Sequence, residues 1–289
     1  MLDLTVIVMT KNEEKNLGKC LRSLRGIAKR IVVVDSGSTD QTAALARKLG
    51  AEVFEHPFTN HAAQLNWGLE NTGIDTKWVL RMDADEELTA ELVQEIVAKL
   101  PALPEKISGI WLRRRVYFMG RWIRHGGVYP TLELRLFCFG KAVCEQRLMD
   151  EHMVLTEGEE TTFARDFIDN NNKELSWWIQ KHNWYSDREM ADHLGRQKEE
   201  WEVKPRLFGG QAERRRWLKN MIYYRTPLMR RAHWYFFYRY ILRGGFLDGK
   251  EGLMFHFLQG YWYRFLVDAK IFEAQKRGSR PEVFEDLKA

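Results

Sequence analysis

Short buried strands alternate with amphipathic helical segments through the first hundred residues, and this pattern constrains the fold more than any other feature. Strands are predicted at 4–9, 31–34, 52–54 and 78–82, and helices at 17–24, 41–49, 61–70 and 89–100. Alternation of this kind specifies an α/β fold, a mostly parallel sheet covered by helices on both faces. Such sheets bind ligands where their strands end, at the carboxyl edge.

The rest of the chain has a different pattern. Two further strands are predicted at 109–112 and 133–137, and the chain is expected to become helical from about Phe163. Residues 205–280 hold 16 Lys and Arg against 5 Asp and Glu, although the whole chain carries only +5. We therefore expect two regions with different tasks: a ligand-binding domain at 1–160 and a helical, basic and aromatic extension at 161–289.

Composition excludes several classes of protein. A chain of 289 residues with 45% hydrophobic residues can bury a core and is not disordered. Its three cysteines form no CxxC motif, which argues against a disulfide framework or a structural zinc site. The first residues lack the features of a signal peptide, and no stretch of 18 uncharged apolar residues occurs, so we expect a cytoplasmic protein.

Acidic residues follow two of the predicted strands. Asp35 comes directly after one, and Asp83 and Asp85 after another. At a strand end that opens into a turn, both carboxylates of the second pair can face one hard divalent cation, Mg²⁺ or Mn²⁺, that also binds phosphates. The alternative is that residues 83–87 only cap the helix that follows. The motifs GxGxxG and GxxxxGK[ST] are absent, which argues against a dinucleotide or P-loop site.

These segments together resemble a known family. The sequences VIVMTKNEE at 6–14, VVDSGSTD at 33–40 and Asp83-Ala84-Asp85 are similar to family 2 glycosyltransferases of the GT-A fold, whose sheet is Rossmann-like. The segment FMGRWIRHGG at 118–127 and RLF at 135–137 resemble the branch of lipopolysaccharide-core β-glucosyltransferases and exopolysaccharide enzymes. The domain at 1–160 would then be the catalytic domain that binds a nucleotide sugar.

The resemblance implies an inverting transfer from a nucleotide-diphosphate sugar, usually a uridine one. Asp35 would accept a hydrogen bond from the base, and Thr10 and Glu13 would lie beside the nucleoside. Asp83 and Asp85 would hold the ribose and the metal–diphosphate.

Three other residues relate to the same donor site. Gln64 and Asn66 resemble the family's Gln-x-Asn feature near the donor. Lys11 stands where the family often has an aromatic residue, and it either contacts phosphate or points into solvent.

A single displacement also needs a carboxylate that takes the proton from the acceptor hydroxyl. Related enzymes carry an acidic motif where this chain has Asp150 and Glu151, and Glu151 is the first candidate for the base. The alternative is that both are solvated turn acids. His152 is either a further metal ligand or a structural residue. Candidates for contacts with diphosphate or acceptor are Arg124, His125, Arg135 and His152.

Basic and aromatic residues are concentrated together near the C-terminus, where 16 of the 37 aromatic residues lie between positions 217 and 265. Helices of this composition are typical of a bilayer interface, so we expect a peripheral position on the inner face of a bacterial cytoplasmic membrane and a lipid-linked saccharide acceptor. The alternatives are packing on the catalytic domain and, less favoured, nucleic-acid binding.

The sequence thus predicts a metal-dependent hexosyltransferase of cell-surface polysaccharide synthesis, in lipopolysaccharide core, exopolysaccharide or capsule. A nucleotidyltransferase also uses strand-end acids with Mg²⁺, but it usually has a glycine-rich, basic loop after its first strand, which this chain lacks. A membrane-bound module that binds a nucleotide sugar without catalysis is the other alternative. The sequence leaves the sugar, the linkage and the oligomeric state open.

Overall fold

The computed structural model describes residues 1–145, 151–195 and 205–278 of the chain. These residues form two compact units. Residues 1–122 and 130–172 make up the first unit within the described part, and residues 123–129 and those from Lys173 onward make up the second. The expected boundary at residue 160 falls within a strand of the first unit.

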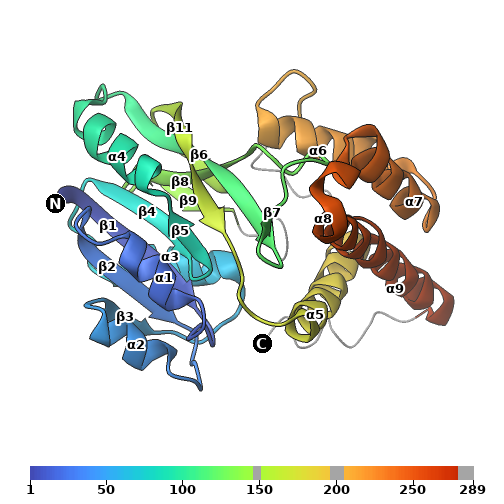
Figure 1. Cartoon of the computed structure of the whole chain (residues 1–289), viewed down its shortest axis with the longest axis horizontal. Coiled ribbons are helices and arrows are strands. Elements are labelled where there is room, and N and C mark those ends of the chain that lie inside the picture. The colour runs from blue at the N-terminus through green and yellow to red at the C-terminus, as the bar shows by residue number, and fades with distance from the viewer. Residues whose placement is uncertain (146–150, 196–204, 279–289) are drawn as a thin grey trace. The chain divides into compact units, whose positions relative to one another are not determined.

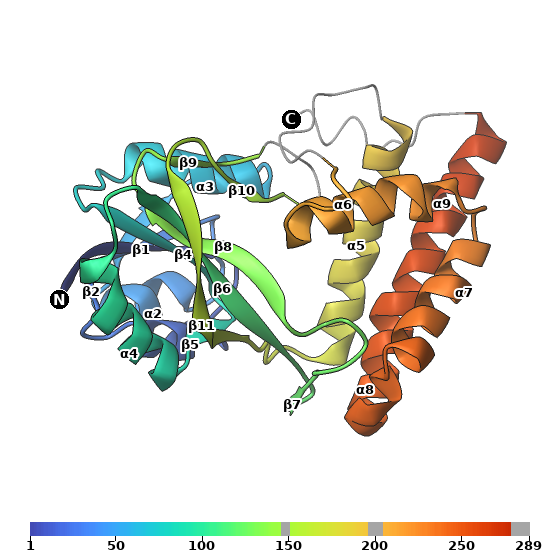
Figure 2. The same ribbon diagram turned by 90° about the horizontal axis from the view of Figure 1, so that it is seen from above.

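The first unit is built on a nine-stranded mixed sheet in the order β3-β2-β1-β4-β8-β6-β11-β5, with β7 paired to β6 (Figures 1 and 2). The strands β1 to β4 run parallel, and β8 is antiparallel to both β4 and β6. All four strands predicted in the first hundred residues are present. The strands are β1 Leu2–Thr10, β2 Ala28–Asp35, β3 Glu52–Glu55, β4 Trp78–Asp83, β5 Glu86–Leu88, β6 Ile107–Phe118, β7 Arg121–Trp122, β8 Thr131–Cys138 and β11 Glu159–Asp169, and β9 Ala142–Cys144 pairs separately with β10 Met153–Leu155.

Helices cover both faces of this sheet because its central strands are apolar on both sides. In β1, Val6 and Val8 pack with α1 and α4, whereas Ile7 and Met9 pack with α3 on the opposite face. All four of these side chains are buried. Successive residues of a strand point to opposite faces, so a continuous apolar run requires two covering layers. The helices are α1 Leu17–Ser23, α2 Thr42–Lys48, α3 His61–Asn71 and α4 Ala90–Lys99.

The helix expected from about Phe163 is wrong, because residues 159–169 form strand β11. Phe163 and Phe167 are four residues apart, a spacing that suits one face of a helix as well as one face of a strand. Both rings are buried in the sheet core. Parallel pairing with β6, with a register shift between Thr162 and Asp166, and antiparallel pairing with β5 decide in favour of the strand.

The second unit is helical, as predicted for the basic and aromatic region. A core of Met190, Tyr263, Val267 and Ile271 lies between α5 and α9. No helix of the described residues is both long enough and apolar enough to cross a membrane. The helices are α5 Leu175–Leu194, α6 Gln211–Met221, α7 Arg230–Phe237, α8 Gly249–Phe255 and α9 Tyr263–Arg277, with π-helical segments at Tyr238–Leu242 and His256–Trp262.

His256 is fully buried in this unit, and neither of its ring nitrogens has a hydrogen-bond partner among the described residues. Its ring packs so closely on two glycines that a Cβ at Gly126 would come within 2.1 Å of it, and one at Gly245 within 2.6 Å. Burial and the nearby Arg239 together lower the pKa of His256 from 6.5 to about 4, while Asp248 acts in the opposite direction. The imidazole is therefore neutral at pH 7.

We expect acidification to destabilise the second unit through His256. Between pH 6.5 and pH 4 the unfolded chain binds a proton at this position and the folded chain does not, so stability falls as pH falls through that window. Between pH 7 and pH 5, His256 should lower the free energy of unfolding by about 2 kcal/mol. Urea unfolding of wild type and His256→Phe at both pH values measures it, and the variant should lose less stability. Equal losses in the two proteins would contradict this prediction.

Candidate functional site

Asp35 is fixed at the carboxyl end of β2. Its carboxylate accepts hydrogen bonds from the Thr10 hydroxyl at 2.7 Å, from the Ser38 backbone N–H at 2.7 Å and from the Ser38 hydroxyl at 2.6 Å. Thr10 is the last residue of β1 and pairs directly with Asp35 in the sheet register. The sheet therefore brings together two of the residues expected at the nucleoside, both almost completely buried.

The loops that follow β1 and β2 are joined by further hydrogen bonds. The ammonium of Lys11 donates to the carbonyl oxygens of Ser36 at 2.7 Å and Gly37 at 2.8 Å. Lys11 thus has a role that neither sequence interpretation included, because it holds the loop after β2. Asn12 has a φ of 54°, unusual for a non-glycine residue, and its side-chain oxygen accepts from the Thr39 N–H. Strained backbone of this kind is concentrated at binding sites.

Glu13 lies in the same pair of loops. Its backbone N–H donates to the Thr42 hydroxyl at 2.7 Å, and its carboxylate accepts from the Asn16 side chain at 2.8 Å. Thr42 begins α2, and Asn16 directly precedes α1. Glu13 therefore connects the starts of two helices at the carboxyl edge of the sheet.

A second cluster of charges lies where β4 ends. Asp83 is 3.1 Å from Arg135 and 3.7 Å from Arg81, while its backbone N–H donates to Glu86 at 2.9 Å. Arg135 also pairs with Glu86, and both of these side chains are buried. Arg135 comes from β8, the antiparallel neighbour of β4, so strand pairing creates the cluster.

The pKa values of the two carboxyl groups in this cluster, Asp83 and Glu86, are shifted in opposite directions. Burial alone would raise the pKa of Asp83, but Arg135 and Arg81 hold it well below its usual range. Burial raises the pKa of Glu86 well above its usual range, and the nearby Asp83 adds to the effect. Asp83 is thus the ionised member of the pair, with 36% of its side chain exposed.

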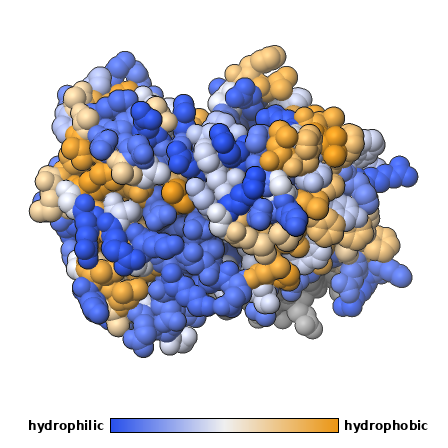
Figure 3. Space-filling view, viewed as in Figure 1, coloured by the Kyte–Doolittle hydropathy of each residue, from blue (hydrophilic) through white to orange (hydrophobic). Residues whose placement is uncertain are grey.

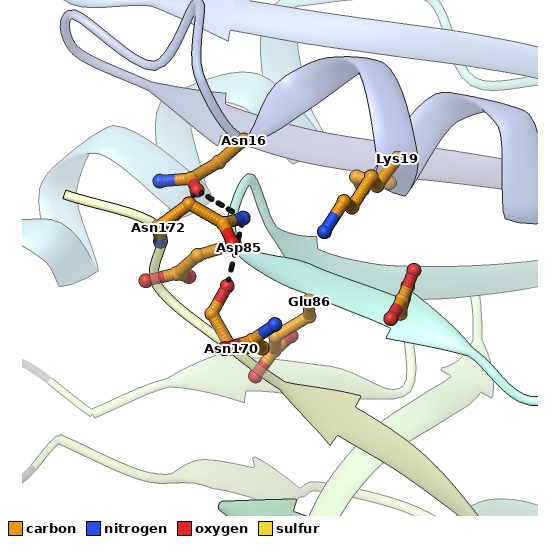
Figure 4. Close-up of a pocket in the computed structure, with 8 residues that line it drawn as sticks. Asn16, Lys19, Asp85, Glu86, Asn170 and Asn172 are labelled. Atoms are coloured by element: carbon orange, nitrogen blue, oxygen red, sulfur yellow. Dashed lines mark hydrogen bonds between the residues drawn. The ribbon is translucent and has the colours of Figure 1, made fainter. Parts of the chain in front are cut away.

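Asp85 is positioned by the segment that follows β11. Its carboxylate accepts from the Asn171 side chain at 2.8 Å, and its backbone oxygen accepts from the Asn170 N–H at 2.9 Å. Asn172 is tied in turn to Asn16, before α1, through its N–H at 2.9 Å and its side-chain amide at 3.0 Å. Figure 4 shows Asp85 beside Asn170 and Asn172 in a small polar pocket. The turn after β4 is therefore held by the segment that follows β11, and that segment is in turn tied to the residue before α1.

Asp83 and Asp85 fit a divalent cation that takes most of its ligands from a bound phosphate-containing substrate and from water. Among the described residues, no group of three or more His, Cys, Asp or Glu could hold a metal ion by itself. Mg²⁺ is commonly held by one or two carboxylates together with phosphate oxygens and water. The ionised, partly exposed Asp83 supplies one hard oxygen ligand of that kind, and Asp85 is two residues away along the turn.

The charges of the expected base and of the same arginines act on one buried thiol, that of Cys144. Burial raises the pKa of the Cys144 thiol to about 12, and it is also influenced by Arg81, Glu151, Glu145 and Arg135. Glu151 is half-buried. The Arg81, Arg135 and Glu151 side chains are therefore close enough to act on one thiol. Asp150, the second candidate, lies outside the described residues.

His152 is paired with a carboxylate that was not singled out from the sequence. Its Nδ1 is 3.0 Å from Glu145, and its backbone N–H donates to the same oxygen at 3.0 Å. The Glu145 side chain is 2% exposed. The pair closes the β9–β10 hairpin, because the Glu145 N–H also donates to the His152 carbonyl. This arrangement orients the imidazole whichever role it has.

Gln64 and Asn66 lie on α3 and make structural contacts. Gln64 is buried and lies 2.8 Å from Nδ1 of His56, which stacks on Trp67. Asn66 donates to the carbonyl of Cys144 and accepts from its N–H, both at 3.0 Å, in the manner of a neighbouring strand. Asn66 therefore holds the strand that leads to Glu145.

Arg124 and His125 belong to the second unit. Their backbone N–H groups donate to one oxygen of the buried Asp248, at 3.0 and 2.8 Å. Nδ1 of His125 lies 2.7 Å from the other oxygen. Asp248 thus fixes the Gly- and Arg-rich loop, and no local pattern in the sequence indicated this partner.

Three residues of the first unit's clusters were not predicted from the sequence: Arg81, Glu86 and Glu145. Glu86 stood within an acidic run in which only Asp83 and Asp85 were expected to bind a ligand, and residues 83–87 were otherwise considered only as a helix cap. Arg81 is a charged residue inside an otherwise apolar strand, and it is 8% exposed. A buried charge needs a partner, so its position in the middle of that run was a usable signal.

Comparison with known proteins identifies a relative of almost the whole chain and relatives of about a third of it. The chain is 28% identical to the lipopolysaccharide core biosynthesis glycosyltransferase LpsC of Rhizobium meliloti over 99% of this chain and 98% of that one. It is 40% identical to an uncharacterized glycosyltransferase of Rickettsia conorii, over 32% of either chain. The matches to the Rickettsia relatives therefore span about a third of their length.

Among solved structures, Staphylococcus aureus TarS residues 1–349 aligns with 96% of this chain and 92% of its own, at 14% identity and a TM-score of 0.46. Glucosyl-3-phosphoglycerate synthase of Mycobacterium tuberculosis, in complex with Mn²⁺, uridine diphosphate and glucosyl-3-phosphoglycerate, aligns with 39% of this chain and 44% of its own. The identity is 24% and the TM-score is 0.33.

The family model described as "Glycosyl transferase family 2" matches residues 5–150, half of the chain. That range contains the strand-end acids and the loops that surround them. The mixed α/β sheet, parallel from β3 to β4, has the GT-A type of architecture that the sequence predicted. With this match, the chain belongs to glycosyl transferase family 2.

Proposed function

We propose that the protein is an inverting glycosyltransferase that moves a hexose from a nucleotide-diphosphate sugar, a UDP-sugar in the first instance, to a lipid-linked saccharide. The observation that carries the proposal is the placement of Asp35 and Asp83 at the ends of β2 and β4, which flank β1 in the sheet. The similarity to LpsC, a lipopolysaccharide core biosynthesis enzyme, supports a place in cell-surface polysaccharide synthesis.

In this proposal the donor nucleoside lies against the loops after β1 and β2. Asp35 accepts a hydrogen bond from the nucleobase, with its orientation fixed by Thr10 and Ser38, and Thr10 and Glu13 lie beside the nucleoside. Gln64 and Asn66 act through the segments they hold rather than by contact with the donor. A carboxylate that is already held in position before the nucleobase binds lowers the entropic cost of binding.

Asp83 and Asp85 would hold a Mg²⁺ or Mn²⁺ ion together with the donor diphosphate. The ion supplies charge neutralisation for the departing diphosphate. Arg135 keeps the pKa of Asp83 low, so this carboxylate stays ionised and able to bind the cation. Arg135 thus acts on the leaving group through Asp83, because its guanidinium is buried and paired.

Glu151 would take the proton from the acceptor hydroxyl as the sugar carbon is attacked, with Asp150 as the second candidate. Glu151 acts electrostatically on the Cys144 thiol, as do Arg81 and Arg135 of the strand-end cluster, which supports a place for this carboxylate in the same part of the first unit. The basic, aromatic C-terminal helices favour a peripheral position at the inner membrane surface, where a lipid-linked acceptor is available. Candidates for contacts with that acceptor are Arg124 and His125, both held by Asp248.

Thermal unfolding with nucleotides tests the donor site. UDP and one UDP-sugar, each with Mn²⁺, should raise the unfolding temperature, because a ligand that binds only the folded state stabilises it by mass action. Asp35→Asn should reduce the shift, whereas Asp75→Asn, a substitution of an exposed acid paired with Lys29, should not. Transfer with the same donor separates an enzyme from a binding module. No shift with any nucleotide diphosphate would contradict the proposal.

A further inference from the structure

The helix that runs from Arg230 to Leu242 packs Ala232, Phe236 and Tyr240 inward and also turns an apolar stripe toward solvent. Trp234, Phe237, Tyr238, Ile241 and Leu242 follow the spacing of one helix face, and their exposed fractions range from 44% to 66%. In a helix that only packs on a protein core, the apolar stripe faces inward. Here the outward stripe indicates an apolar partner.

The inward side of the same helix carries arginines. Arg231 is 2% exposed and donates to the buried Asp268 at 2.7 Å. Arg239 is 8% exposed and donates to the Gly126 carbonyl at 2.9 Å. Both are held in place by specific partners, which prevents the helix from rotating its apolar stripe inward. The outward stripe is therefore built into the packing.

The apolar surface continues past the end of this helix. Phe246 and Leu247 lie in the following turn, with 49% and 56% of their surface exposed, and Leu253 and Phe257 in the next helical segment are each 45% exposed. Figure 3 shows hydrophobic residues gathered over the C-terminal helices. We call the exposed apolar side chains between Trp234 and Phe257 the apolar surface. Contiguous apolar patches on a protein exterior mark interaction sites.

The charges around the apolar surface are of one sign. Arg230, Arg243 and Lys250 are exposed, and Arg230 precedes Trp234 by one helical turn. Of the two acids between residues 230 and 257, Asp248 is buried against His125, and Glu251 is only partly exposed. The exposed rim is therefore basic. Such a rim complements anionic headgroups, and Trp and Tyr at its border suit the headgroup depth.

We propose that the apolar surface docks on a bilayer that contains anionic phospholipid, with Phe246 and Leu247 inserted below the headgroups and Arg230, Arg243 and Lys250 at their level. The attachment is interfacial, with an apolar helix side facing the lipid and basic residues facing the headgroups. This inference rests on the proposed function and deepens it, because it assigns the membrane contact to particular residues and to a lipid class.

Flotation of the full-length protein with vesicles tests the docking. Wild type should float with vesicles of phosphatidylcholine and phosphatidylglycerol and far less with phosphatidylcholine alone. Phe246→Asp/Leu247→Asp should reduce the bound fraction at least about tenfold, because it places two charges at the inserted position. Val97→Asp is the matched control: this apolar residue of α4 is 47% exposed, and its substitution should leave binding unchanged.

A dye on the inserted turn gives a second measurement. All three native cysteines are buried, so a polarity-sensitive label should react selectively with Leu247→Cys or with the control Val97→Cys. Anionic vesicles should shift the emission of the label at position 247 toward that of an apolar environment, and leave the label at 97 unchanged. No shift at 247 would overturn the insertion.

Three other results of the vesicle and sedimentation experiments would overturn the proposal. Equal binding to neutral vesicles would overturn the lipid class, and unchanged binding of the double variant would overturn the surface. A dimer of wild type in analytical ultracentrifugation that the double variant loses, without vesicle binding, would assign the surface to a second copy of this chain. UDP-induced stabilisation of the same double variant separates these results from a failure of the donor site, because that shift tests only the proposed function.

Discussion

Replacing Asp85 by Asn is expected to reduce transfer at least about a thousandfold, because neutral Asn is a poor ligand for a hard cation and the departing diphosphate loses its charge neutralisation. The side chain keeps its size, and an amide oxygen still accepts from Asn171, so the fold should persist. Initial rates of UDP release with and without acceptor measure the loss, and the unfolding temperature checks the fold.

Glu87→Gln is the control for this experiment, because it removes one negative charge from the same acidic run, two residues away in β5, and should retain activity. Chelation of divalent ions should reduce wild type to the level of Asp85→Asn, and added Mn²⁺ should restore only wild type. An Asp85→Asn enzyme within about tenfold of wild type would remove this residue from the proposed metal site.

Replacing Glu151 by Gln should lower kcat by a factor of about 10² to 10⁴, the range that general bases contribute. Because the proposed donor site lies elsewhere, along the strand ends, the UDP-induced rise in unfolding temperature should remain. The measurement is kcat with saturating donor over a range of pH, since loss of a base also removes the limb of the pH profile that depends on its ionisation.

Asp150→Asn is made separately, and one of the two variants should be inactive while still binding donor. Glu157→Gln serves as the control, because this nearby acid is exposed and paired with Lys141. If both Glu151→Gln and Asp150→Asn keep wild-type rates, the base is another group. Loss of donor binding in Glu151→Gln would instead give this carboxylate a role in holding the donor.

Much of the scaffold of the proposed donor site could be predicted from the sequence because its signals are local. The apolar run at 31–34 ends in Asp35, and the run at 78–82 ends in Asp83, so each acid is placed at a strand end by its own segment. Parallel strands in a covered sheet then bring such ends to one edge. The structure adds that Thr10 and Asp35 are direct register partners, which no single segment specifies.

The partners of these acids could not be predicted, because they come from strands far away in the sequence. Arg135 reaches Asp83 and Glu86 only because β8 pairs antiparallel with β4. The sequence suggested a diphosphate contact for Arg135, whereas the structure shows this side chain buried between two carboxylates. Asp248 is a comparable case, since it holds the loop at 124–125 from more than 120 positions away.

The sequence by itself determined which segments alternate, where the strand-end acids lie and that the C-terminal region is basic, aromatic and helical, because periodicity and local composition carry this information. Only the tertiary structure decided that residues 159–169 form a strand and that the helix at 230–242 turns its apolar stripe outward. The spacing of the apolar residues does not distinguish a helix from a strand at 159–169, and it does not tell which side of the helix at 230–242 faces the core. The free energy that chooses between them comes from long-range contacts, the pairing of β11 with β6 and β5 and the buried Arg231–Asp268 pair.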